Sequence, residues 1–316
     1  MLTAIDETGA QPAVATEGPT SPTPAAGRMV GLDGIRALAV IAVVVYHFDP
    51  TWLPGGFFGV DLFFVISGFL ITGIVVRQWE RTGHIDLVGF WLRRARRLLP
   101  AVIALLAVVV LISAVCAPDA LSRLRTDVPA ALLYVTNWWF VFHKVSYFQA
   151  SGRPSLLLHL WSLAIEEQFY VLWPLALTLL LPRVKRLSRI AAGTAVAAVG
   201  STVLMAILFQ PHGTDPSRVY FGTDTHAQGL LIGCTLALVL PHARLALLRS
   251  RFSQVWFNLL GAAGMAALGW LVFSLNDYES ATYRGGFLLV DLAAAALVIA
   301  AASPAPLWSS TLAHQP

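Results

Sequence analysis

Apolar residues run through this chain in long stretches that carry almost no charge and are separated by short polar connections. A helix that crosses the hydrocarbon core of a membrane needs roughly 20 apolar residues. Stretches of this kind predict spanning helices at residues 30–48, 57–76, 98–117, 161–182, 190–209, 226–241, 255–275 and 286–303. The apolar stretch at 128–142 is shorter, and we expect a re-entrant or interfacial element there.

The composition supports this interpretation. Of 316 residues, 57% are hydrophobic and only 12% are charged, whereas a soluble domain carries about 25% charged residues. Too little polar surface remains to cover a large water-soluble core. The sequence therefore predicts an all-α fold, a polytopic transmembrane helix bundle of about 8–10 spans with no soluble domain.

The distribution of charge predicts the orientation of the bundle. Positive charges beside spans mark the cytoplasmic side, and three connections are rich in them: 77–97, 183–189 and 242–251. Three others carry few basic residues and should face outside: 49–56, 210–225 and 276–285. The net charge is +4, and because the basic residues lie in short loops, we expect membrane lipid rather than nucleic acid as their partner.

The ends of the chain and its cysteines suggest no further chemistry. Residues 1–28 are rich in Pro, Thr, Ala and Gly and predict a disordered tail, without the pattern of a secretory signal peptide. Residues 304–316 are expected to form a C-terminal tail. Cys116 and Cys234 lie in or beside apolar runs, which favours packing or lipid contact over a disulfide or a metal site.

Ionisable residues inside spans are costly and usually face a bundle interior or an aqueous cavity. In the first span, Arg36 and His47 are eleven residues apart, which separates their levels by about 16 Å along a helix. Taken alone, Arg36 could snorkel to the headgroups and His47 could cap its helix. Asp61 could cap the second span or orient His47 by a hydrogen bond, and Ser67 follows in the same glycine-rich segment.

The string "LLHLWSLAIEEQFYVLWPL" carries a second polar group. His159, Ser162 and Glu166 share one helical face because their spacing is i, i+3 and i+7. Glu166 and the adjacent Glu167 could be helix-dipole partners. The surrounding aromatic residues instead place them at or inside the membrane interface, where a carboxylate needs a partner, and His47 is the candidate.

Two more strings combine charge with helical spacing. The string "FWLRRARRLLP" contains Arg93, Arg94, Arg96 and Arg97. They could be a cytoplasmic anchor, or their i, i+3 and i, i+4 pairs could grip the phosphates of a cosubstrate.

In "RVYFGTDTHAQGLLIGCTLAL", Arg218, Asp224 and His226 cluster at the outer end of a span, as a loop cap or as an acceptor-binding rim. Gly229 and Gly233 in the same string predict a close helix contact.

Together, "GLDGIRALAVIAVVVYHF", "GGFFGVDLFFVISGFLIT" and the three strings above resemble the membrane-bound acyltransferase-3 family, in the family's order and over about residues 29–303. The resemblance implies that Arg36 and His47 are the family's basic-x10-His pair and that Glu166 is its WSLxxE carboxylate. The family's RxxR element would be Arg93/Arg96 or Arg94/Arg97. The family's usual last span, with a Ser-Tyr-Gly-Leu-Tyr-Leu-Trp-His type motif, is expected to be missing from 29–303.

The resemblance implies an integral membrane O-acyltransferase of a bacterial inner or plasma membrane. It would move an acetyl or other short acyl group from acyl-CoA, a cosubstrate rather than a bound cofactor, to a hydroxyl of a surface or lipid-linked glycan. His47 would be the general base or a covalent acyl carrier, oriented by Glu166 or Asp61. Acyl-CoA would bind Arg36 and the four clustered arginines. The candidate substrate-binding residues are Ser67, His159, Ser162, Arg218 and Asp224.

Two other functions remain compatible with the sequence. A proton-coupled transporter could use His47, Asp61 and Glu166 as a relay. A shortened member of the family could also be a noncatalytic glycan-binding remnant.

Overall fold

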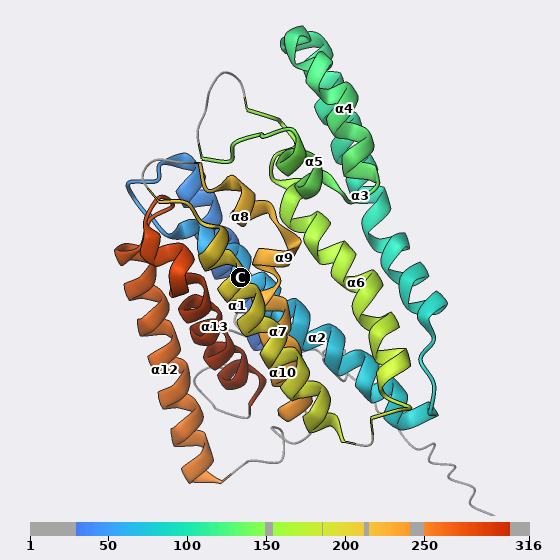
Figure 1. The fold of residues 1–316 in the computed structure, drawn as a ribbon, viewed down its shortest axis with the longest axis vertical. Helices are drawn as coiled ribbons and strands as arrows, with labels where there is room; N and C mark the ends of the chain where they lie inside the picture. The colour runs from blue at the N-terminus through green and yellow to red at the C-terminus, as the bar shows by residue number, and fades with distance from the viewer. Residues whose placement is uncertain (1–29, 149–153, 185, 212–214, 241–249, 304–316) are drawn as a thin grey trace, which may run out of the picture.

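The structure, a computed structural model, describes residues 30–148, 154–184, 186–211, 215–240 and 250–303. Throughout these ranges every regular element is a helix (Figure 1). Seven are long and apolar enough to cross a membrane: α1 (Val30–Phe48), α2 (Gly59–Thr82), α3 (Leu87–Cys116), α6 (Leu160–Leu180), α7 (Leu187–Leu208), α12 (Arg251–Ser274) and α13 (Phe287–Ala302). The predicted all-α polytopic bundle is confirmed, and the chain is a multi-pass membrane protein.

Shorter helices occupy the connections. They are η1 (Gly56–Phe58), η2 (Pro118–Ala120), α4 (Leu121–Leu132), α5 (Thr136–Phe142), α8 (Ser217–Phe221), α9 (Thr223–His226), α10 (Gln228–Val239) and the π-turn η3 (Thr282–Gly286). The apolar stretch at 128–142 forms the end of α4 and the whole of α5. The span expected at 226–241 contains the twelve-residue α10, which is only about 18 Å long. The helix is interrupted at Ala227, between α9 and α10.

Helix α2 is the centre of the bundle, and glycine allows its neighbours to approach it closely. A Cβ on Gly68 would lie 2.0 Å from the carbonyl oxygen of Leu230, and a Cβ on Gly233 would lie 2.1 Å from that of Val65. The backbones of α2 and α10 therefore touch, which confirms the predicted small-residue contact. On the other side, a Cβ on Gly59 would lie 2.4 Å from the carbonyl oxygen of Ala39, so α1 packs equally close.

The prediction of a basic loop at 77–97 is wrong. Helix α2 ends with Gly83 in the left-handed conformation at φ 70°, and α3 begins at Leu87, where the carboxylate of Asp86 accepts a hydrogen bond from the Gly89 N–H at 2.8 Å. Hydropathy misses the first turns of α3 because arginines occupy them. The C-terminal glycine and the N-cap aspartate are the signals that mark this boundary.

Helix α6 stands between two parts of the bundle. Figure 1 shows the α3–α4 pair on one side of it and α1, α2, α10 and α13 on the other. The ends of α1 and α3, the start of α6, and helices α5 and α8 lie at one end of the molecule, which we call the outer end. The predicted tails at 1–28 and 304–316, and most of the loop at 242–251, lie outside the described residues.

Candidate active site

His47 lies at the outer end of α1 with its ring exposed. Its Nδ1 is 2.7 Å from the carbonyl oxygen of Val43, one turn earlier in the same helix. Because a carbonyl only accepts hydrogen bonds, Nδ1 carries the hydrogen, and the lone pair of the neutral ring is assigned to Nε2. Nε2 lies 3.1 Å from the hydroxyl oxygen of Tyr147, which donates to it.

Two side chains outside α1 flank this imidazole. Burial raises the pKa of Tyr147 to about 12, so its hydroxyl remains a donor at neutral pH. The ring of His159, at the start of α6, lies edge-on to His47 with 4.6 Å between the ring centres. Partial burial, and then the charge of His47, lower the pKa of His159. His47 and the candidate substrate-binding residue His159 are therefore in contact. Tyr147 was missed because it lies in a loop 100 residues away, where no periodicity relates it to α1.

The expectation that Asp61 orients His47 is wrong. Its Oδ1 lies 2.8 Å from Nε2 of His226, and both side chains are fully buried. The reason is helical geometry: Gly59 faces α1, and two residues further along a helix is a rotation of about 200°. Asp61 therefore points away from α1, toward α9.

Glu166 does not contact His47 either. The hydroxyl of Ser67 on α2 donates to its Oε1, and the Tyr170 hydroxyl lies 3.4 Å from the same oxygen. Glu166 lies six residues into α6, about 9 Å below its outer end, whereas His47 lies next to the outer end of α1. The positive charge of Arg94 and, more weakly, that of Arg36 act on this carboxylate.

Glu166 lines a cavity of about 290 Å³ between α1, α2 and α6. The other lining residues are Val40, Val43, Val44, Val60, Phe63, Phe64, Ser162 and Leu163. The valines of α1 lie between the levels of Arg36 and His47, on the side of the helix that carries both. Arg36 itself makes an ion pair with Asp33 at 3.6 Å.

The arginine cluster is divided between two environments. Arg94 turns toward α6, with its Nη2 2.6 Å from Glu167 Oε1 and its guanidinium carbon 3.3 Å from the centre of the Tyr170 ring. Arg94 and Glu167 line a second cavity, of about 430 Å³, between α3 and α6. Arg93 is exposed, 3.7 Å from Asp86.

Arg96 and Arg97 are also exposed. Three of the four arginines thus remain accessible, while Arg94 is already paired.

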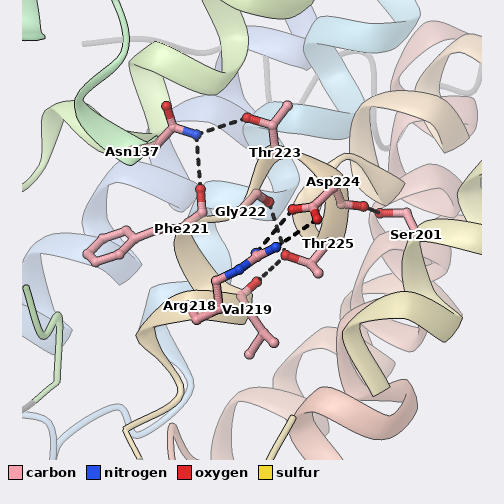
Figure 2. Close-up of polar contacts among 9 residues, drawn as sticks. All are labelled: Asn137, Ser201, Arg218, Val219, Phe221, Gly222, Thr223, Asp224 and Thr225. Atoms are coloured by element: carbon pink, nitrogen blue, oxygen red, sulfur yellow. Dashed lines mark hydrogen bonds and ion pairs between the residues drawn. The ribbon is translucent and has the colours of Figure 1, made fainter. Parts of the chain in front are cut away.

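Arg218 and Asp224 hold the turn between α8 and α9 together (Figure 2). The guanidinium donates to both carboxylate oxygens, at 3.1 and 2.8 Å. Both side chains remain more than a third exposed. The contacts correspond to the loop-cap interpretation, and a role in binding the acceptor stays a prediction. Ser162 donates to the carbonyl oxygen of His159 at 3.4 Å.

Comparison with known proteins relates the sequence of this chain to a family. A family model described as an acyltransferase domain matches residues 29–313. The chain is 46% identical over 288 residues to the peptidoglycan O-acetyltransferase OatA of Listeria monocytogenes, a match that covers 90% of this chain and 46% of that protein. It is 42% identical over 287 residues to the O-acetyltransferase OatA of Staphylococcus aureus, covering 90% of this chain and 47% of that protein.

No solved structure matches the chain. The chain spans about half the length of the curated relatives it matches. The family model nevertheless covers every described helix, including those that carry His47, Glu166 and the arginines. The chain belongs to the membrane-bound acyltransferase-3 family.

Proposed function

We propose that this chain passes an acetyl or other short acyl group from acyl-CoA to a hydroxyl of peptidoglycan or of a lipid-linked glycan precursor, with His47 as the reacting base. Family membership and the names of the relatives support an O-acetyl transfer to glycan. The observation that carries the assignment of His47 is the contact of its Nδ1 with the Val43 carbonyl oxygen, from which the tautomer follows. With Nδ1 bound to the Val43 carbonyl, the lone pair of the exposed ring is available on Nε2.

The proposed step is a general-base transfer. Nε2 of His47 takes the proton of the acceptor hydroxyl while the hydroxyl oxygen attacks the thioester carbonyl carbon. The carbon–sulfur bond breaks, and the thiolate of CoA leaves with the electron pair and then takes up a proton. The Tyr147 hydroxyl occupies the place of the acceptor hydroxyl in the resting site, so the acceptor replaces that hydrogen bond. A covalent acyl-imidazole, the alternative route, would use the same lone pair.

The donor is proposed to approach along α1. The cavity beside Glu166 is near the lower end of the range for ligand pockets, about 300–1,000 Å³. Its size suits the thioester end of a pantetheine arm better than a nucleotide. Arg36 lies about 16 Å below His47, and Arg93, Arg96 and Arg97 are exposed to meet phosphates. Glu166, which lines this cavity and accepts a hydrogen bond from Ser67, would hold the arm there.

The transporter alternative gains no support. It required His47, Asp61 and Glu166 to form one relay. These three groups have separate hydrogen-bond partners, namely Tyr147, His226 and Ser67.

The test uses the intact protein in membrane vesicles, with labelled acetyl-CoA on the cytoplasmic side and glycan O-acetylation measured by mass spectrometry. His47→Gln should lower the rate by about 10²-fold or more, the usual contribution of a general base. His143→Gln is the matched control, because His143 also bonds the carbonyl one turn earlier, at 2.9 Å from Trp139, yet lies outside the cluster. Equal loss in both variants, or no loss in His47→Gln, would contradict the assignment.

A further inference from the structure

A continuous series of contacts links a buried acid–base pair to the imidazole of His47. Asp61 Oδ1 lies 2.8 Å from His226 Nε2, and His226 Nδ1 lies 2.9 Å from the carbonyl oxygen of Tyr220. The Tyr220 ring packs on the Tyr147 ring with 4.7 Å between centres. The Tyr147 hydroxyl reaches His47 at 3.1 Å. The series connects α2, α9, α8 and the loop after α5 to α1.

Both ring nitrogens of His226 are committed. Nδ1 faces a carbonyl oxygen, so it must carry a hydrogen. Nε2 and Asp61 share a second one, either as imidazolium and carboxylate or as imidazole and carboxylic acid, and the pair has no net charge in either form. Both side chains are 0% exposed, so water cannot replace either partner.

His226 is one of several connections that fix the α8–α9 segment, defined as residues 217–226. The Asn137 side chain on α5 donates to the carbonyl oxygen of Phe221 at 3.1 Å, and the Ser201 hydroxyl on α7 donates to that of Asp224 at 2.8 Å (Figure 2). His226 provides the connection on the α2 side. Helix α2 packs directly on α1 at Gly59. The contact of His226 with α2 therefore fixes the position of the α8–α9 segment relative to the helix that carries His47.

The α8–α9 segment in turn holds Tyr147 at two points. The backbone N–H of Tyr147 donates to the hydroxyl oxygen of Ser217 at 2.7 Å, and its ring packs against Tyr220. Tyr220 is itself fully buried, with its ring 4.5 Å from that of Trp161. A displacement of Tyr220 would therefore move the hydroxyl that Nε2 of His47 accepts from.

We propose that His226 is a positioning residue for acyl transfer: through the carbonyl of Tyr220 it fixes the α8–α9 segment, and the segment holds Tyr147 against Nε2 of His47. The inference rests on the proposed role of His47 as the reacting group. It assigns two separable tasks to the His226 ring. Nδ1 donates a hydrogen bond to the Tyr220 carbonyl of the α8–α9 segment, and Nε2 contacts Asp61.

Two substitutions separate these tasks. The amide nitrogen of Asn can replace Nδ1, so His226→Asn keeps the bond to the Tyr220 carbonyl and loses the contact to Asp61. The longer Gln reaches the place of Nε2, so His226→Gln keeps the contact to position 61 and loses the Tyr220 carbonyl. Both are made in the Asp61→Asn background, so that neither variant leaves a buried charge without a partner, and thermal unfolding of the purified proteins establishes that they fold.

Two readouts decide the outcome. The first is kcat for acyl transfer, which His226→Gln should lower by up to about fivefold, the effect of losing the Tyr147 hydrogen bond itself, while His226→Asn stays close to the background. The second is the rate at which diethyl pyrocarbonate modifies His47, followed by peptide mass spectrometry with His143 as the internal reference. His226→Gln and Tyr147→Phe should both raise this rate by about fivefold, the factor for one lost hydrogen bond.

The inference is overturned if His226→Gln leaves the modification rate of His47 unchanged while Tyr147→Phe raises it. Equal effects of the Asn and Gln variants on both readouts would also overturn it, since the Tyr220 carbonyl would then be irrelevant. The modification rate does not depend on turnover. If His47→Gln retains acyl transfer, the proposed function fails, but the modification rate of His47 still decides whether His226 holds Tyr147 against Nε2 of His47.

Discussion

Glu166 and Glu167 are neighbours in the chain, yet they face different sides of α6. Glu166 faces α1 and α2, accepts hydrogen bonds from the hydroxyls of Ser67 and Tyr170, and lines the cavity of about 290 Å³. Glu167 faces α3, is ion-paired with Arg94, and lines the cavity of about 430 Å³. A step of about 100° around one helix separates the two environments.

The difference suggests two tasks for two identical side chains. A carboxylate beside a cavity whose direct hydrogen-bond donors are two neutral hydroxyls keeps part of its hydrogen-bonding capacity for a ligand. A carboxylate already paired with a guanidinium has its charge compensated and joins two helices. We therefore expect Glu166 to matter chiefly for turnover and Glu167 chiefly for the attachment of α3 to α6.

The largest effect should come from Arg94→Ala, which removes the partner of Glu167. Breaking one partner of a largely buried ion pair typically costs about 3–5 kcal/mol of unfolding free energy, and the two side chains are only 22% and 12% exposed. Thermal unfolding in detergent measures the loss. Arg93→Ala, one residue away but 66% exposed, should stay within about 0.5 kcal/mol of the unmodified protein.

Adding Glu167→Gln to Arg94→Ala should recover part of that loss, because no uncompensated carboxylate then remains. An unfolding midpoint of Arg94→Ala equal to that of Arg93→Ala would show that the pair does not join the helices. Donor binding should be tested separately with Arg97→Ala, which is exposed and should raise the KM for acyl-CoA without lowering stability.

The next effect concerns Glu166→Gln. Its amide oxygen can still accept from Ser67, so we expect unfolding free energy to change by no more than about 1 kcal/mol. The kcat for acyl transfer should fall by about 10²-fold, within the range for a charged group placed at the reaction. Glu167→Gln is the matched comparison, and it should reduce stability more than turnover. The opposite pattern, with Glu166→Gln unstable and Glu167→Gln inactive, would reverse the comparison.

A smaller effect should follow Tyr147→Phe, which lies beside His47 at the outer end of the molecule, on the side of α6 that Glu166 faces. The substitution removes one hydrogen bond to Nε2 of His47, worth about 1 kcal/mol. We expect kcat to fall by about fivefold, the same free energy expressed as a rate, with KM for acyl-CoA unchanged because the donor binds elsewhere. Unchanged turnover in Tyr147→Phe would mean that the hydroxyl does not orient the imidazole.

The smallest effect is a pH dependence of stability from His159, on the same side. Its folded-state pKa is lowered from 6.5 by partial burial and by His47, so between the two pKa values the unfolded chain binds a proton that the folded chain does not. Stability from this residue is therefore present above about pH 6.5 and is lost as pH falls through the lowered value. Between pH 7.5 and 5.5, Tm should fall about 1–2 °C further in the unmodified protein than in His159→Gln. Parallel curves would remove His159 as the cause.

Sequence periodicity correctly grouped side chains on helical faces but could not say which helix each face meets. Ser162 and Glu166, predicted to share one helical face, line one cavity, and Gly233 correctly indicated a close helix contact. The partner of Asp61 was 165 residues away, on a four-residue helix too short to show a period. The partner expected for it, His47, is close to Asp61 in the sequence but does not contact it in the structure.

Loops account for the remaining differences. Tyr147 follows α5 in a segment without regular structure, and only tertiary packing on α8 brings its hydroxyl to α1. The start of α3 was readable from Gly83 and Asp86, but the arginines that follow concealed the helix from a hydropathy pattern. Adjacent glutamates gave no signal of their different roles, because the partners that distinguish them lie on α2 and α3.

The orientation of the His47 ring by the Val43 carbonyl has an evolutionary consequence. An orienting carboxylate can be deleted by one codon change, but a main-chain oxygen is encoded by no particular residue, and any amino acid at position 43 supplies it. The tautomer of His47 is thus set by the main chain of its own helix, so substitutions of the side chain at position 43 do not remove the hydrogen bond. Substitutions around the site can therefore change what Nε2 meets while the direction of the ring stays the same.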